Sequence, residues 1–135
     1  MKFMDYDNDG WVDIFQSNGA MLDNIHIYHS EVTYAEPKLM FRNLGKGKFE
    51  KVSEYLGPDF MRPTVGRGCA AGDYDNDGDL DVAIINRDDF PEILRNDGGN
   101  ANNWLTVKLI GTKAARDGTG TKLKLVYSLV GADPG

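Results

Sequence analysis

Aspartate residues gather in two short stretches of the chain with identical spacing. The hexapeptide Asp-Tyr-Asp-Asn-Asp-Gly stands at residues 5–10 and again at residues 73–78, at an offset of 68. One more aspartate follows each copy at loop position 9, which gives the pattern D-x-D-x-D-G-x-x-D. This pattern supplies carboxylate oxygens at positions 1, 3, 5 and 9, and a main-chain carbonyl at position 7 can add another. We therefore expect each stretch to bind a cation.

The donor set favours calcium, with one ion in each loop. Calcium takes about six to eight oxygen ligands, whereas zinc or copper would require histidine or cysteine, which neither loop contains. At position 7 we expect the main-chain carbonyl to be the ligand, so that the side chain of Asp79 stays in solvent. The predicted metal ligands are Asp5, Asp7, Asp9, Trp11, Asp13, Asp73, Asp75, Asp77, Asp79 and Asp81, with Trp11 and Asp79 acting through their carbonyl oxygens.

Two other interpretations of the loops are weaker. An EF-hand needs a glutamate at loop position 12, where this chain has Gln16 and Ile84, and its flanks would show a helical repeat. Plain aspartate-rich turns between strands are the alternative, with Gly10 and Gly78 at the sharp bends. Eight carboxylates at matching positions in two copies exceed what a turn requires, so we favour the metal sites.

The repeat extends beyond the loops and predicts an all-β fold. Residues 41–45 return in looser form at 94–98, an offset of 53, so the first repeat carries about 15 extra residues, which we place within 20–37. A hairpin loop is expected at 44–47, and one helical turn at 53–56 with Ser53 as its cap. Alternating or apolar segments predict strands over residues 11–17, 38–43, 48–52, 80–86, 92–96, 104–110 and 122–126.

The residue pattern of the chain changes after residue 96. A polar, glycine-containing linker covers residues 97–103, and two alternating segments follow, 104–110 and 122–126, on either side of the sequence Arg-Asp-Gly-Thr-Gly at 116–120. That sequence predicts a hairpin turn. We therefore divide the chain into residues 1–100, which hold both calcium loops, and residues 101–135, a partial β-hairpin module.

The composition of the chain argues against a membrane-spanning helix and against a nucleic-acid partner. The chain has 135 residues, 41% of them hydrophobic, and no apolar run of the roughly 18 residues that a membrane helix needs. Its net charge of -6 has the wrong sign for a nucleic-acid backbone, so we expect no nucleic-acid partner. The single cysteine, Cys69, cannot form an internal disulfide. The first residues also show no apolar segment of a signal peptide.

Residues 1–100 resemble the FG-GAP/VCBS repeats of integrin-like β-propellers. The acidic loops carry this resemblance, together with Leu-Met-Phe-Arg-Asn at 39–43, Gly-Lys-Phe at 47–49 and the glycine-rich run at 66–72. Residues 103–109 and 116–120 are similar to the start of an ASPIC/UnbV domain, which follows such repeats in proteins related to cartilage acidic protein. The resemblance implies about two calcium-stabilised propeller blades in an extracellular, periplasmic or cell-surface protein. Because closed propellers have roughly four to eight blades, we expect the chain to be an internal fragment.

The resemblance implies a structural, adhesion or ligand-binding module, with a protein or carbohydrate as the partner of the complete propeller. The alternative is part of a calcium-dependent enzyme that acts on polysaccharides, which would need a convergent acid-base set away from the metal. His26 and His29 have metal-ligand spacing, but we expect them to be exposed in the insertion. Cys69 lies among small residues and is expected to be a packed thiol. We therefore expect no enzymatic activity.

Overall fold

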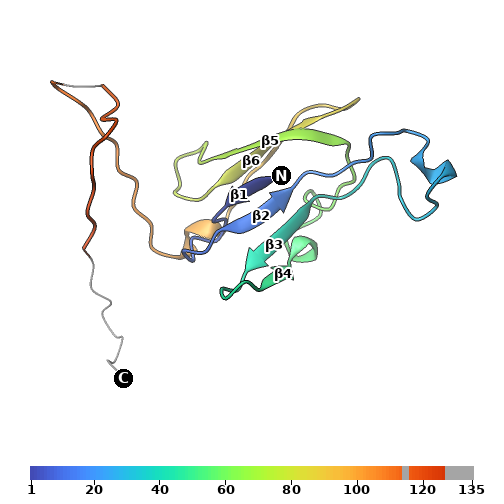
Figure 1. The fold of residues 1–135 in the computed structure, drawn as a ribbon, viewed down its shortest axis with the longest axis horizontal. Coiled ribbons are helices and arrows are strands. Elements are labelled where there is room, and N and C mark those ends of the chain that lie inside the picture. The colour runs from blue at the N-terminus through green and yellow to red at the C-terminus, as the bar shows by residue number, and fades with distance from the viewer. Residues whose placement is uncertain (114–115, 127–135) are drawn as a thin grey trace. The chain divides into compact units, whose positions relative to one another are not determined.

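The computed structural model of the chain describes residues 1–113 and 116–126 and is all-β apart from three short 3-10 helices. Its residues form two compact units, Met1–Leu105 and Thr106–Gly135. The first unit holds two antiparallel sheets (Figure 1). One sheet has the order β1-β2-β3-β4 and the other the order β5-β6-β7, so the strands of each sheet follow one another as in the chain. The all-β prediction is confirmed.

The strands of the first sheet are β1 (Lys2–Met4), β2 (Asp13–Gln16), β3 (Leu39–Asn43) and β4 (Phe49–Lys51). Those of the second sheet are β5 (Gly66–Gly72), β6 (Asp81–Asn86) and β7 (Glu92–Leu94). The 3-10 helices are η1 (Ile25–Ile27), η2 (Ser53–Tyr55) and η3 (Gly99–Ala101).

Strand pairing reproduces the two offsets of the sequence repeat. Met4 faces Asp13 across β1 and β2, and Gly72 faces Asp81 across β5 and β6, which corresponds to the offset of 68. In the same way, Ile14 pairs with Phe41 and Val82 pairs with Leu94, so the third strands are related by the offset of 53. The two sheets are therefore structural copies through their third strand, and the first sheet adds β4.

The difference between the two offsets lies in the connection from the second strand to the third. Residues 17–38 join β2 to β3 and include η1, whereas residues 87–91 suffice to join β6 to β7. The inserted segment is mostly exposed, and it includes the exposed side chains of His26 and His29. The guanidinium of Arg67 anchors it by donating to the carbonyl oxygens of Gly19 (3.1 Å) and Ala20 (2.6 Å). The predicted insertion and the exposure of its histidines are confirmed.

The hydrophobic core combines residues of both sheets and of the segment between them. Phe15 of β2 is fully buried and meets the ring of Phe60 edge to face, with 5.9 Å between the ring centroids. Cys69 is half-buried and packs against the core. The buried apolar cluster consists of Met4, Phe15, Met40, Val52, Phe60, Val82 and Ile84. The burial of this shared cluster joins the two sheets into one unit.

The predicted turns agree with the structure except at Ser53. The β3–β4 hairpin loop has positive φ at Gly45, Lys46 and Gly47, and a helical turn over Ser53–Tyr55 precedes Gly57, which also has positive φ. Ser53 does not cap this turn: Val52 is the N-cap residue. The Ser53 hydroxyl is fully buried and instead accepts a hydrogen bond from the backbone N–H of Met40 (2.9 Å). The structure uses this hydroxyl to join η2 to β3.

The two strands predicted at 104–110 and 122–126 are not formed. The described part of residues 102–126 has no strand, although the predicted turn is present, with positive φ at Gly118 and Gly120 and a hydrogen bond from Thr121 N–H to the Gly118 carbonyl (3.0 Å). The apolar side chains of these segments are exposed, including Leu105, Val107, Leu123 and Leu125. Alternation alone does not make a strand without a partner and a covered face. Residues 127–135 of the predicted second module lie outside the described residues.

Candidate metal sites

Each acidic loop connects the first two strands of its sheet. Loop 1, residues 5–13, joins β1 to β2, and loop 2, residues 73–81, joins β5 to β6. Asn8 and Asn76 have φ of +52° and +62°, and Gly10 and Gly78 have φ of +89° and +98°. Asparagine and glycine are the residue types that most readily adopt this left-handed region. The two loops therefore share one backbone conformation because their local sequences are the same.

The first aspartate of each loop organises the backbone around it. The two carboxylate oxygens of Asp5 accept hydrogen bonds from the N–H groups of Asp9 (3.1 Å) and Gly10 (2.9 Å). Asp73 accepts the equivalent bonds from Asp77 (3.1 Å) and Gly78 (3.1 Å). Each carboxylate oxygen has two lone pairs, so these bonds leave acceptor capacity for a cation.

The last aspartate of each loop ties the loop to the third strand region. Buried Asp13 accepts hydrogen bonds from the N–H groups of Tyr6 (3.1 Å) and Asn43 (2.7 Å). Buried Asp81 repeats the arrangement with Tyr74 (2.9 Å) and Asn96 (2.8 Å). Burial raises the pKa of the Asp13 carboxyl, and the two backbone N–H groups oppose that rise.

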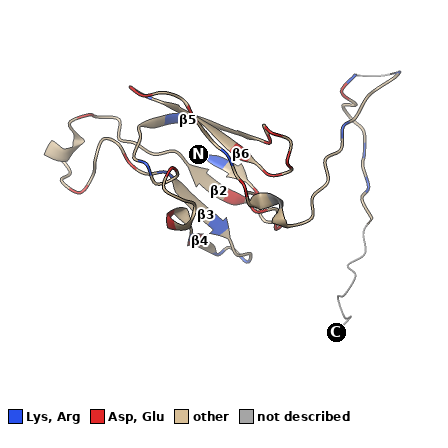
Figure 2. Cartoon of the chain, turned by 180° about the vertical axis from the view of Figure 1, so that it is seen from behind, with Lys and Arg blue, Asp and Glu red and all other residues tan. Residues whose placement is uncertain are grey.

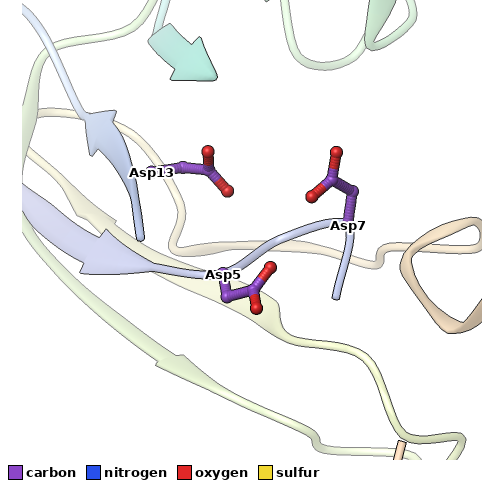
Figure 3. Close-up of side chains that lie close together, drawn as sticks. All are labelled: Asp5, Asp7 and Asp13. Atoms are coloured by element: carbon purple, nitrogen blue, oxygen red, sulfur yellow. The ribbon is translucent and has the colours of Figure 1, made fainter. Parts of the chain in front are cut away.

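Three carboxylates converge in each loop. Ligand oxygens of Asp5, Asp7 and Asp13 lie within 4.8 Å of one another, and so do those of Asp73, Asp75 and Asp81. Figure 3 shows the carboxylates of Asp5, Asp7 and Asp13 directed toward a common space. Two oxygens bound to one calcium ion at roughly 2.3–2.6 Å are at most about 5 Å apart, so this spacing fits a single ion. Each of these groups could hold a metal ion.

The third loop position supplies the clearest ligand atom. Oδ1 of Asp7 is buried and accepts no hydrogen bond from the described residues. Burial, together with repulsion from Asp9 and Asp5, raises the pKa of this carboxyl against the opposing effect of Arg42. Desolvation and repulsion from Asp77 and Asp81 raise the pKa of Asp75 in loop 2. A bound cation would offset this crowding of like charges, so the residues present fit the metal.

The remaining predicted ligands lie at the edges of these groups. Asp9 and Asp77 are outside the converging sets of three, and their Oδ1 atoms accept the N–H of Trp11 (2.9 Å) and of Asp79 (3.2 Å). The side chain of Trp11 is half exposed and lies against Gly45. The expectation that the Asp79 side chain is solvated is wrong, because this residue is fully buried. Asp79 packs closely against Gly99: a Cβ added to Gly99 would lie 2.7 Å from the Cβ of Asp79.

Three asparagines that sequence reasoning did not assign bind loop 1 to distant parts of the chain, and the side chain of one of them, Asn8, reaches loop 2. Asn8 donates from its side-chain amide to the carbonyl oxygens of Gly78 (3.1 Å) and Gly99 (2.9 Å). Asn96 donates to the Tyr6 carbonyl (2.6 Å) and Asn102 to the Asp7 carbonyl (2.8 Å). The asparagines stand in the sequence as ordinary turn residues, and no local signal marks them as partners across 70 or more positions.

The positively charged side chain of Arg42 lies close to loop 1. Arg42 of β3 places its Nε 2.8 Å from Oδ2 of Asp7 and donates from a terminal nitrogen to Oδ2 of Asp9 (3.2 Å). Figure 2 shows a basic segment in β3 and acidic segments in both loop regions. Arg95 corresponds to Arg42 in the second repeat, and it places its Nε 2.7 Å from Oδ1 of Asp97.

Comparison with known proteins identifies the repeat. The FG-GAP-like repeat family matches residues 5–84, which include both acidic loops and the strands between them. No curated protein and no solved structure matches the chain. No helix in the described part of the chain is long and apolar enough to cross a membrane. On the match over residues 5–84, the chain belongs to the FG-GAP-like repeat family.

Proposed function

We propose that this chain is a calcium-binding repeat module of a β-propeller, with one calcium ion in each acidic loop. The observation that carries the proposal is the convergence of three carboxylates in each of two equivalent loops, with Asp7 Oδ1 buried and without a hydrogen bond from the described residues. Calcium would be held by side chains at loop positions 1, 3, 5 and 9 and by the carbonyl oxygens of Trp11 and Asp79.

Bound calcium would stabilise the folded state of this module. Each loop joins two strands, and its last aspartate binds the backbone next to the third strand, so a metal bound to that aspartate connects three strands of one sheet. Because the ion binds the folded loop and not the unfolded chain, it stabilises the folded state.

The wider role that we propose for the module rests on the resemblance to FG-GAP/VCBS repeats. We place the module in an extracellular, periplasmic or cell-surface propeller whose partner is a protein or a carbohydrate. Residues 101–135 would belong to an ASPIC/UnbV-like module. Further blades, from this or another chain, would complete the propeller, since roughly four to eight blades close the ring.

A binding role is favoured over catalysis. A cleft of about 760 Å³ in the first unit is lined by apolar residues, by the acids Asp59, Glu92 and Asp97, and by Arg62 and Arg95. Of the three acids, Asp97 is paired with Arg95. Glu92 is held in ion pairs with Lys38 and Arg62, with 2.8 Å between Lys38 Nζ and Glu92 Oε2. Both oxygens of the Glu92 carboxylate are engaged in ion pairs, which gives this residue a structural role.

The test is a thermal melt of the full chain in about 1 mM calcium, in magnesium and in excess EDTA, with calcium stoichiometry from calorimetry. A ligand at about 100 times its Kd stabilises the folded state by about 2.7 kcal/mol. We expect calcium to raise the melting temperature by several degrees, magnesium to act less, and two calcium equivalents to bind. Asp7→Ala and Asp75→Ala should each remove one equivalent. Identical melts in calcium and EDTA would contradict the proposal.

A further inference from the structure

The two repeats place equivalent arginines differently with respect to their acidic loops. Arg42 contacts two carboxylates of its own loop, Asp7 and Asp9. Arg95 occupies the corresponding place in the second repeat. Its ion pair is with Asp97, outside loop 2, and its charge also has a weaker electrostatic effect on Asp75. Arg42 therefore bridges the third and fifth positions of loop 1 through ion pairs, whereas Arg95 forms its ion pair outside loop 2.

The contacts of Arg42 do not involve the candidate ligand atom of Asp7. The guanidinium meets the Oδ2 atoms of Asp7 and Asp9, whereas Oδ1 of Asp7 accepts no hydrogen bond from the described residues. Arg42 thus offsets the charge of Asp7. A planar guanidinium with several N–H donors suits such a two-carboxylate contact better than an ammonium group does.

We propose that Arg42 is a resident counter-ion of loop 1, which keeps this loop formed without calcium and weakens calcium binding there. This inference rests on the proposed function, because it assumes that both loops take calcium. Without the metal, the guanidinium reduces the repulsion between Asp7 and Asp9. With the metal, the same positive charge lies next to a divalent cation and repels it.

The affinity of loop 1 can be measured by itself in the full chain. In an Asp75→Ala/Asp77→Ala background, loop 1 keeps all its carboxylates and loop 2 loses two, so calorimetric titration with calcium chloride reports loop 1. Arg42→Met in this background removes the guanidinium and keeps a long apolar side chain. Arg95→Met is the matched control, because it removes the same charge from the equivalent place in the other repeat. Circular dichroism confirms that each variant is folded.

We expect Arg42→Met to bind calcium at loop 1 about tenfold more tightly than its parent, because a nearby positive charge is removed. Arg95→Met should change this affinity less than about twofold, since salt screens more distant charges. Arg42→Lys keeps the charge and should stay closer to the parent than Arg42→Met does. In EDTA, with both loops intact, Arg42→Met should lower the melting temperature more than Arg95→Met does.

The possible results distinguish a failure of the inference about Arg42 from a failure of the proposed calcium-binding function. If the parent binds calcium and Arg42→Met binds it equally or more weakly, the role of Arg42 is wrong while the calcium sites stand. If the parent does not bind measurably and Arg42→Met does, the inference is supported. If neither binds but the wild-type chain takes one equivalent, Arg42 does not exchange with calcium and the inference fails. If the wild-type chain binds no calcium, the proposed function fails first and the inference fails with it.

Discussion

The side-chain amide of Asn8 in loop 1 donates a hydrogen bond to the carbonyl oxygen of Gly78 in loop 2, at 3.1 Å. The same amide also donates to the Gly99 carbonyl. The two candidate calcium loops are thus in direct contact, although one lies near the start of the chain and the other begins only at Asp73.

Replacement of Asn8 by glycine should destabilise the chain by about 1–3 kcal/mol, because two hydrogen bonds that each contribute about 0.5–1.5 kcal/mol are lost while positive φ stays accessible. Urea unfolding measures this change. Asn76→Gly is the matched control, since Asn76 has the equivalent position and conformation but is exposed. Equal effects of the two variants would show that the contact between the loops contributes nothing.

Gly78 and Gly10 should differ in their tolerance of alanine. A Cβ on Gly78 would lie 1.9 Å from an indole atom of Trp104, whereas a Cβ on Gly10 would meet nothing within 4 Å. Both substitutions place an alanine at positive φ, which costs roughly 1–2 kcal/mol. We expect Gly78→Ala to lose at least about 1 kcal/mol more than Gly10→Ala in urea unfolding, because Trp104 must also move. Trp104→Ala should remove most of this difference, and a difference that persists would contradict the contact.

Lys38 should be the most sensitive charged residue outside the loops. Its side chain is fully buried, lies 2.8 Å from Glu92 Oε2 and donates to the Arg62 carbonyl at 3.1 Å. Removal of one partner of a buried ion pair costs about 3–5 kcal/mol, so Lys38→Met should lower the free energy of unfolding by that amount. Lys51→Met, which breaks the exposed pair with Glu54, should change it by less than about 1 kcal/mol. Similar losses in both variants would contradict the importance of burial.

The stability effect of Asp75→Asn should change sign with calcium. In EDTA, desolvation and repulsion from Asp77 and Asp81 raise the pKa of Asp75 in the folded state. A raised pKa means that the folded state binds more protons than the unfolded state, so the contribution of Asp75 to stability falls as pH rises from its unfolded pKa through its folded pKa. Asparagine does not titrate, so Asp75→Asn should be more stable than the wild type in EDTA at pH 7.

Thermal melts at pH 7, 5.5 and 4 measure this effect. In EDTA the advantage of Asp75→Asn should shrink as pH falls through the folded-state pKa, because the wild-type carboxyl then becomes neutral. In calcium at pH 7, the variant should instead be less stable, since a ligand is lost. Asp23→Asn in the exposed insertion is the control and should show no reversal. If Asp75→Asn kept one sign in both solutions, loop 2 would not be a metal site.

The sequence by itself determined the parts of the structure that depend on neighbouring residues. The two loops adopt one conformation because asparagine and glycine recur at the positions of positive φ, and strand pairing follows the offsets of 68 and 53. The insertion and the β3–β4 hairpin loop follow from residue spacing and turn chemistry in the same way.

Only the tertiary structure decided what each repeated residue contacts. Asn8 and Asn76 occupy the same local position, but in the part of the chain that the structure describes only Asn8 bridges to the other loop. Arg42 and Arg95 likewise form ion pairs with different carboxylates. The burial of Asp79 and the Lys38–Glu92 pair also depend on segments distant in the chain, as does the lack of strands in the described part of 102–126. Local spacing determines backbone conformation, whereas burial and ion pairing depend on which surfaces the fold brings together.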